Sequence, residues 1–342
     1  MNSKPIITGV LSYGMSGRVF HTPFLDQSNY FELRAVVERS QKNAQNDYPE
    51  IISYNKVEDL LADDLIELVV VNTPNDTHVD FARKALLAGK HVLIEKPFAP
   101  TVKDAEQLFE LGAKVGKKVL PYHNRRFDSD FLSLKEVIEK GFVGKPIELH
   151  IRFDRYTPGL SQKVFKEKKN RAANGVLFDL GSHLLDQTIS LFGKPRTMTK
   201  IKSSHREKSK VDDYAALILT YEGGLKVFIT TSLLVAQPQK SFVLHGTKGS
   251  FVKDRTDVQE QQLLAGMKPL DPGYGIEPLG CEGTLTVMGE DGRQDVRIVA
   301  NKGNYMEVFD SVYQTIRADK PYFVSPEEIL WQLSILQPEK IS

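Results

Sequence analysis

Apolar and polar positions in the first 124 residues alternate between two periods. Short runs of β-branched and other apolar residues have the pattern of buried strands, and the segments between them repeat apolar residues every three or four positions, as an amphipathic helix does. The clearest helix is predicted at 77–88, where Val79, Ala82 and Leu86 share one face and Gly89 follows at the position of a helix C-cap. Strands are predicted at 5–11, 31–37, 68–72, 91–95 and 118–122.

The order strand, helix, strand predicts an α/β fold, with an N-terminal domain over 1–124 whose sheet is parallel and doubly wound. After residue 124 the pattern changes to two helical segments followed by alternating strands with turn sequences between them. We therefore predict a second, α+β domain over 125–342 with a largely antiparallel sheet. Its helices are expected at 131–140 and 178–192, its strands at 147–153, 215–221, 225–233 and 241–244, and a long loop at 253–281.

Composition excludes several classes of protein. The 45 Lys and Arg nearly balance the 44 Asp and Glu, so no large field is left to hold nucleic acid or anionic lipid, and neither is an expected partner. The one cysteine, Cys281, excludes an internal disulfide and a C-x-x-C metal or redox motif. No run approaches the roughly 18 apolar residues of a membrane span, and the first residues lack a signal-peptide pattern, so a cytoplasmic protein is expected.

The first predicted strand is followed by Ser12-Tyr13-Gly14-Met15-Ser16-Gly17, where the dinucleotide fingerprint G-x-G-x-x-G would open a helix. Serine replaces the first glycine. Gly14 would let the backbone approach a pyrophosphate, Gly17 would let the helix pack on the strand, and the helix N-terminus would supply N–H donors. The alternative is a tight turn without a ligand. Its place at the first strand-to-helix junction favours a cofactor site at these six residues.

The second predicted strand is followed by Glu38, 21 residues past Gly17, close to the spacing of about 20 at which a carboxylate bonds the ribose of NAD. Arg39 and Ser40 come next, and a guanidinium can instead pair with the 2′-phosphate of NADP. The cofactor is therefore predicted to be NAD or NADP, with NAD slightly favoured by the carboxylate.

Four further motifs occur in order. They are Asn72-Thr73-Pro74-Asn75 with His78, then Glu95-Lys96-Pro97, Tyr122-His123-Asn124-Arg125-Arg126-Phe127, and Asp179-Leu180-Gly181-Ser182-His183. With the glycine turn they make the chain resemble the glucose-fructose oxidoreductase and inositol dehydrogenase family, called Gfo/Idh/MocA, over nearly its whole length. Within that family the Tyr-His-Asn-Arg-Arg and Asp-Leu-Gly-Ser-His motifs most resemble those of the bacterial scyllo-inositol dehydrogenase branch.

The resemblance implies an NAD(P)-dependent dehydrogenase with a Rossmann domain, an open-faced sheet domain, and dimers or tetramers built through that sheet. It also implies a catalytic set of Lys96, Asp179 and His183. The other residues predicted to bind cofactor are Arg39, Asn72, Thr73, Pro74, His78 and Glu95, and those predicted to bind substrate are His123, Asn124, Arg126 and Tyr156.

The residue types of this set suit the oxidation of a secondary alcohol. His183 can take a proton near neutral pH, and the Lys96 ammonium can hold the substrate oxygen at the carboxyl end of the parallel sheet. Asp179 precedes His183 by four residues, so the two share one helix face and Asp179 can orient a hydroxyl or the imidazole. With Asp186 they could instead be read as metal ligands, but no cysteine joins them, and we predict no metal.

The expected substrate is a polyol, inositol or sugar, because the predicted substrate residues are rich in hydrogen-bonding groups. Two other functions remain open. One is a sensor of the same fold that binds dinucleotide without turnover. The presence of the candidate catalytic residues Lys96 and His183 argues against a sensor. The other is a dinucleotide-dependent hydrolase or lyase, which would turn over substrate with no net change in nicotinamide absorbance.

Overall fold

The computed structural model describes residues 4–161, 167, 173–290 and 292–337, and the chain divides into two compact units. The first contains residues up to 124 together with 260–274 and 305–333, and the second contains 125–259, 275–304 and the residues from 334 onward. The division at 124 and 125 coincides with the predicted boundary, but two segments that the sequence placed in the second domain, 260–274 and 305–333, belong to the first unit.

Aromatic packing explains why 305–333 belongs to the first unit. Helix α9 (Met306–Ala318) places Phe309 parallel to Phe24, with ring centroids 5.2 Å apart, and Tyr313 parallel to Tyr30 at 4.2 Å. Stacked aromatic pairs add to the free energy gained by burial. An amphipathic helix distant in sequence therefore completes the core around the first strands.

The sheet of the first unit is parallel throughout, in the order β3-β2-β1-β4-β5-β6. This confirms the predicted doubly wound sheet. Strand β4 is fully buried along its length, as a central parallel strand must be when helices cover both faces. The strands are β1 (Ile6–Val10), β2 (Phe31–Val37), β3 (Ile52–Tyr54), β4 (Leu68–Val71), β5 (His91–Ile94) and β6 (Val119–Pro121).

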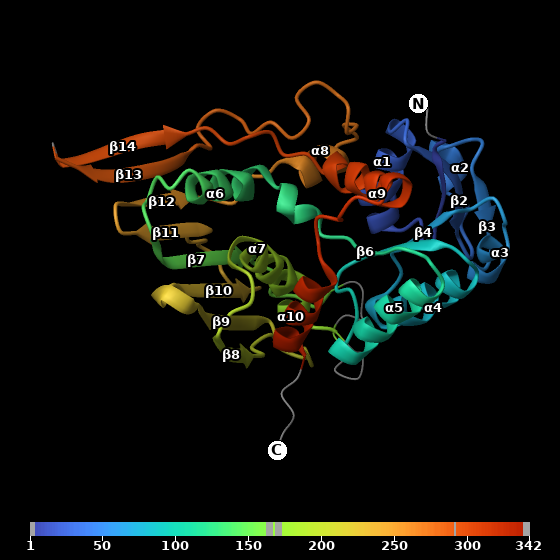
Figure 1. Ribbon diagram of the computed structural model, residues 1–342, viewed down its shortest axis with the longest axis horizontal. Helices are drawn as coiled ribbons and strands as arrows, with labels where there is room; N and C mark the ends of the chain where they lie inside the picture. Colours follow the sequence, from blue (N-terminus) through green and yellow to red (C-terminus); the bar gives the residue numbers. More distant parts are fainter. Residues whose placement is uncertain (1–3, 162–166, 168–172, 291, 338–342) are drawn as a thin grey trace, which may run out of the picture. The chain divides into compact units, whose positions relative to one another are not determined.

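The helices of the first unit follow its strands, and α4 and α5 lie side by side (Figure 1). Thr101 begins α5, since its hydroxyl accepts a hydrogen bond from the backbone N–H of Asp104. Besides α9 and most of α10 (Pro326–Leu336), the helices are the π-helical η1 (Gly17–His21), α1 (Thr22–Gln27), α2 (Ala44–Asp47), α3 (Val57–Leu61), the 3₁₀ turn η2 (Asn75–Thr77), α4 (His78–Leu87), α5 (Val102–Lys114) and most of α8 (Gln259–Leu264). The short helix α8 lies inside the expected loop 253–281.

The second unit is built on one mixed sheet in the order β14-β13-β12-β11-β7-β10-β9-β8. Only β7 and β10 pair in parallel, so the sheet is largely antiparallel, as predicted. The strands are β7 (Pro146–Asp154), β8 (Thr197–Ser203), β9 (Tyr214–Thr220), β10 (Lys226–Ser232), β11 (Phe242–Gly246), β12 (Gly249–Lys253), β13 (Gly283–Gly289) and β14 (Gly292–Ile298).

Helices cover one face of this sheet. Helix α6 (Ser129–Glu139) contacts β12, and α7 (Ser182–Phe192) contacts β7 and β10 on the same side in Figure 1. Along β7 every second residue from Leu149 to Phe153 is buried, while His150 and Arg152 between them stay half-buried. Burial thus alternates along the strand, which is the pattern of a sheet with one covered face.

The expected helix 178–192 is two helices in the structure. Its first part is the π-helical η5 (Leu177–Gly181), and α7 continues from Ser182. A short 3₁₀ turn, η3 (Asn124–Phe127), precedes α6, and another, η6 (Glu222–Gly224), joins β9 to β10.

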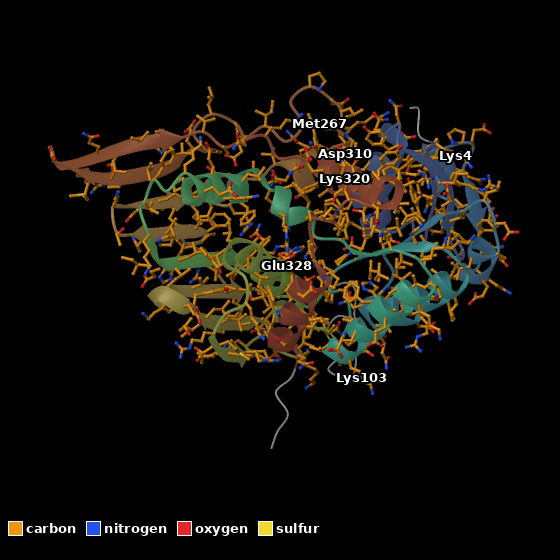
Figure 2. All side chains as sticks on the ribbon, viewed as in Figure 1. Lys4, Lys103, Met267, Asp310, Lys320 and Glu328 are labelled. Atoms are coloured by element: carbon orange, nitrogen blue, oxygen red, sulfur yellow. The ribbon has the colours of Figure 1, made fainter. Side chains whose placement is uncertain are left out.

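The last described helix, α10 (Pro326–Leu336), begins with a reciprocal cap. The Ser325 backbone N–H donates to Glu328 Oε2 at 2.7 Å, and the Ser325 hydroxyl accepts from the Glu328 N–H at 3.2 Å. Glu328 is labelled in Figure 2. Such a capping box followed by proline fixes the start of a helix. Over the described ranges, no helix combines the length and the apolar character needed to cross a membrane.

Candidate functional site

The candidate cofactor residues of the first unit follow the carboxyl ends of adjacent strands. The order of the sheet reverses between β1 and β4, and the glycine turn follows β1 while Asn72 follows β4. Glu95 and Lys96 follow β5, the next strand. Ligands of open α/β sheets bind beyond the carboxyl ends at such a reversal. The structure therefore brings these predicted residues together at the expected edge.

The glycine turn is packed so closely that Gly17 cannot carry a side chain. A Cβ there would lie 2.0 Å from the Ser12 carbonyl oxygen, which also accepts a 2.8 Å hydrogen bond from Asn72 Nδ2. Gly14 differs, because it is exposed and the nearest atom to its Cβ would be the Ser12 hydroxyl oxygen at 3.4 Å. Gly17 is thus needed to close the turn. Gly14 is exposed, although its N–H donates to the Ser12 hydroxyl at 3.3 Å and its carbonyl accepts the Arg18 N–H at 2.9 Å.

Tyr13 points away from the open side of this turn. Its side chain is buried and its hydroxyl donates to Asp47 at 2.5 Å, while its ring meets Tyr48 edge to face at 6.3 Å. Burial, followed by the bond to Asp47, raises the pKa of the Tyr13 phenol. Tyr13 therefore fastens the turn to α2, and only its backbone is left to meet a ligand.

Glu38 does not present a free carboxylate to a ribose. Oε1 accepts the Asn43 N–H at 2.9 Å and Oε2 accepts the Ser53 hydroxyl at 2.8 Å, and both oxygens are 3.3 Å from the Ala44 nitrogen. The carboxylate caps α2, where a helix N-terminus attracts an anion, and is buried with the residue 8% exposed. Arg39, in contrast, is exposed. The geometry thus corrects the reason given above for favouring NAD.

The motif after β4 is held by its own polar groups. The hydroxyls of Thr73 and Thr77 are 2.6 Å apart, and the Thr77 hydroxyl donates to the Pro74 carbonyl at 2.6 Å. His78, which begins α4, is 1% exposed and lies with Nε2 2.8 Å from the Thr73 carbonyl and Nδ1 3.0 Å from the Pro97 carbonyl. Burial lowers its pKa. His78 is therefore held between two backbone carbonyls.

Glu95 joins the glycine turn to Lys96. Its Oε1 accepts the Ser16 hydroxyl at 2.7 Å and lies 2.9 Å from His21 Nε2, and its Oε2 accepts the Lys96 N–H at 3.0 Å. Burial would raise the pKa of this carboxyl, but the contacts with His21 and Ser16 and the charge of Lys96 lower it to about 2. The carboxylate is therefore charged at any physiological pH.

His123 and Asn124 follow β6 at the same edge of the first unit. They are 3% and 4% exposed, and Tyr122 beside them donates its hydroxyl to the Phe20 carbonyl at 2.9 Å. Both residues therefore follow shortly after the end of β6, and the protein itself covers most of their surface.

In the second unit Arg126 is used within the protein. Its Nε and Nη2 donate to the two carboxylate oxygens of Asp186 on α7, at 2.9 and 2.8 Å. Such a bidentate pair fixes both side chains. Arg126 therefore links η3 to α7 through its ion pair with Asp186. Among the residues described, no group of three or more His, Cys, Asp or Glu side chains could hold a metal ion.

Asp179 and His183 lie on either side of the junction between η5 and α7. His183 is 5% exposed and Asp179 is half-buried. π-Helical turns are rare overall, but those that occur are often found at functional sites. The glycine turn of the first unit is likewise followed by a π-helical turn, η1. Tyr156 is 62% exposed and pairs with Leu234 in an isolated bridge.

Sequence reasoning missed His21, which is fully buried and contacts the candidate cofactor loop. The available signal was its place four residues after Gly17, in the turn that the fingerprint predicted. A lone histidine among apolar residues gave no reason to expect a charged partner from another strand.

Comparison with known families identifies both parts of the chain. Residues 6–123 match the family described as "Oxidoreductase family, NAD-binding Rossmann fold", and residues 131–252 match the "GFO/IDH/MocA C-terminal domain". The two matches cover all six strands of the first unit's sheet and the strands from β7 into β12.

Similar proteins extend over nearly the whole chain. An uncharacterized oxidoreductase of Schizosaccharomyces pombe is 38% identical, over 91% of this chain and 90% of its own. The scyllo-inositol 2-dehydrogenase (NADP(+)) IolW of Bacillus subtilis is 32% identical, over 97% and 92%. The solved structure of the putative oxidoreductase yvaA from Bacillus subtilis superposes with a TM-score of 0.92 at 32% identity, over 97% and 94%.

Proposed function

The chain belongs to the Gfo/Idh/MocA oxidoreductase family, and on that premise we propose that it is a dehydrogenase that transfers hydride between a nicotinamide dinucleotide and a carbinol carbon of a polyol, inositol or sugar. One observation carries the proposal. Ser16 of the glycine turn and the backbone N–H of Lys96 bond the same carboxylate, that of Glu95. A candidate catalytic amine is thereby joined to the turn that would hold the cofactor.

The residues at the glycine turn fit a dinucleotide. Gly17 allows the turn to close on Ser12, and exposed Gly14 has no side chain to keep a pyrophosphate away from the turn. The N–H groups that open η1 supply donors for an anion. The nicotinamide, when bound, supplies the hydride acceptor or donor.

We favour NADP over NAD as the cofactor. The Glu38 carboxylate is taken up by Asn43, Ala44 and Ser53, so it has little capacity to bond a ribose. The guanidinium of exposed Arg39 is suited to a 2′-phosphate. The printed name of IolW, which includes NADP(+), agrees with this choice.

The proton transfers are proposed for the three residues of the predicted catalytic set. We propose that Lys96 holds the oxygen of the reacting hydroxyl as its proton leaves, and that His183 takes that proton at an imidazole nitrogen. Asp179 orients the imidazole or a neighbouring hydroxyl. In the reverse direction His183 returns the proton to the alkoxide oxygen.

Absorbance of the reduced nicotinamide tests this function. Purified protein is assayed with NADP and NAD against inositols, common aldoses, 2-hydroxy acids and cyclohexanol. At least one inositol or aldose should give turnover. Cyclohexanol and the 2-hydroxy acids should give almost none, since a site built to bond several hydroxyls is left with unpaired groups by a ligand that lacks them.

Three results would contradict the proposal. Similar kcat/KM values for cyclohexanol and for the best polyol would show that the substrate is not selected by several hydroxyl groups. Tight cofactor binding with no turnover on any compound would point to a sensor. Substrate conversion with no change in nicotinamide absorbance would point to a hydrolase or lyase. Light scattering of the same sample would test the expected dimer or tetramer.

A further inference from the structure

Two buried histidines contact the short segment that carries Lys96. His21 ends η1 and is 0% exposed, and His78 begins α4 and is 1% exposed. They come from different loops of the first unit and meet the segment at Glu95 and at Pro97, one residue on either side of Lys96. The proton transfers proposed above use neither histidine.

His21 acts on Lys96 through Glu95. Its Nε2 lies 2.9 Å from Glu95 Oε1, and its ring is held by Tyr122, with centroids 4.5 Å apart, and by Phe309 edge to face at 6.3 Å. The aromatic packing leaves the imidazole in one place. Because Glu95 Oε2 accepts the Lys96 N–H, a shift of the carboxylate would move the backbone of Lys96.

The charge of Glu95 makes this contact strong. Its pKa of about 2 keeps the carboxylate ionised, and a carboxylate whose side chain is only 12% exposed is stable in the charged form only when it is paired and hydrogen-bonded. His21 and Ser16 donate to the same oxygen, Oε1. Removing His21 would leave that oxygen with one donor and free it to shift.

His78 holds the other side of the segment. Its ring stands between the carbonyls of Thr73 and Pro97, at 2.8 and 3.0 Å, and both carbonyls can only accept a hydrogen bond. A neutral imidazole carries a single N–H and bonds one of them at a time. In either tautomer the ring fills the space between the loop after β4 and the loop after β5.

We propose that His21, through Glu95, and His78, through the Pro97 carbonyl, are positioning residues that fix Lys96 relative to the glycine turn. Cofactor affinity then depends on both histidines, although neither touches the cofactor. The effect on affinity follows from the network alone, while the effect on kcat rests on the proposed function.

The first test is a double-mutant cycle on cofactor affinity, read from the fluorescence of NADPH without substrate. His21→Leu and Glu95→Gln should each raise the Kd for NADPH about 10-fold, because a loosened segment must be ordered again when the cofactor binds. The double variant should be no weaker than the weaker single variant, because both changes break one interaction. His21→Gln, which keeps a donor for Glu95, should recover most of the affinity.

His91 provides a matched control on the same strand. It begins β5, at the end away from Lys96, and its Nδ1 accepts the Lys118 N–H at 2.9 Å. His91→Gln should leave the Kd for NADPH within 2-fold of wild type even where it lowers Tm. His78→Ala should raise that Kd, and His78→Gln, which keeps a donor for a carbonyl, should recover part of it.

The outcomes separate this inference from the proposed function. A Kd within 2-fold of wild type in both Glu95→Gln and His21→Leu, or effects that multiply to about 100-fold in the double variant, would overturn it. An unchanged Kd for NADPH in His78→Ala would show that His78 is not a positioning residue. If NADPH binding follows the expected cycle but no polyol is turned over, the inference stands and the proposed function fails. Where turnover is found, His21→Leu should lower kcat more than it changes the substrate KM.

Discussion

Replacing each glycine of the phosphate turn by alanine separates folding from cofactor binding. In Gly17→Ala the new Cβ would lie 2.0 Å from the Ser12 carbonyl oxygen, so the backbone of the turn must move by more than 1 Å to reach an ordinary contact of about 3.4 Å. In Gly14→Ala the nearest atom, the Ser12 hydroxyl oxygen, is already 3.4 Å away, and nothing in the turn need move.

The two variants therefore have different expected magnitudes. Gly17→Ala should cost about 3 kcal/mol, the upper end for an added methyl in a packed region, which shifts Tm by roughly 6–12 °C in a unit of this size. Gly14→Ala should leave Tm within about 1 °C, because an exposed surface substitution changes stability little. Its methyl group stands where the pyrophosphate must approach the backbone, so the Kd for NADPH should rise about 10-fold or more.

Differential scanning calorimetry and NADPH titration of the same samples measure both quantities. A stable Gly17→Ala protein with wild-type Tm would contradict the packing argument. Wild-type NADPH affinity in Gly14→Ala would contradict the placement of the cofactor at the turn, whatever the Tm.

Three further predictions concern charge and chemistry. Lys96→Ala and His183→Ala should each lower kcat about 100-fold or more with the fold retained, since acid–base groups contribute about 10²–10⁴-fold, and wild-type turnover in either variant would remove that residue from the catalytic set. Glu38→Gln should lower Tm and leave the ratio of NADPH to NADH affinity nearly unchanged, whereas Arg39→Ala should weaken NADPH alone; titration with both cofactors decides, and a ratio that follows Glu38 would restore the ribose contact. Because the pKa of Glu95 falls from a usual 4.5 to about 2, its stabilisation is complete above pH 4.5 and is lost as the pH falls toward 2. Acid unfolding of Glu95→Gln should therefore depend less steeply on pH in that range than acid unfolding of the wild type, and parallel curves would contradict this.

The strands of the first unit were predictable because parallel strands covered on both faces are continuous apolar runs. Strand β4 is buried at every position and its predicted and observed bounds differ by one residue. Strand β3 is three half-buried residues and has no such run. Strand β14 is almost wholly exposed, so its sequence lacks the alternation that marks β7 or β9. Exposed and very short strands are specified by their neighbours more than by their own residues.

The site followed the same division. The positions of the glycine turn, of Lys96 and of His123 came from the sequence, since each follows a predicted strand at the carboxyl edge of the sheet. The use of each polar group did not. Glu38 has the spacing of a ribose ligand, yet it caps α2, and Arg126 has the place of a substrate residue, yet it pairs with Asp186.

The sequence by itself thus determined the continuously apolar strands, their order, the family and the edge of the sheet where the candidate residues gather, because periodicity and turn residues act over a few neighbouring positions. Only the tertiary structure decided the partners of the charged side chains and the return of α9 to the first unit. Those depend on distances between residues far apart in the chain, such as His21 and Glu95 or Phe24 and Phe309, and no local pattern encodes which distant donor or ring will be within reach.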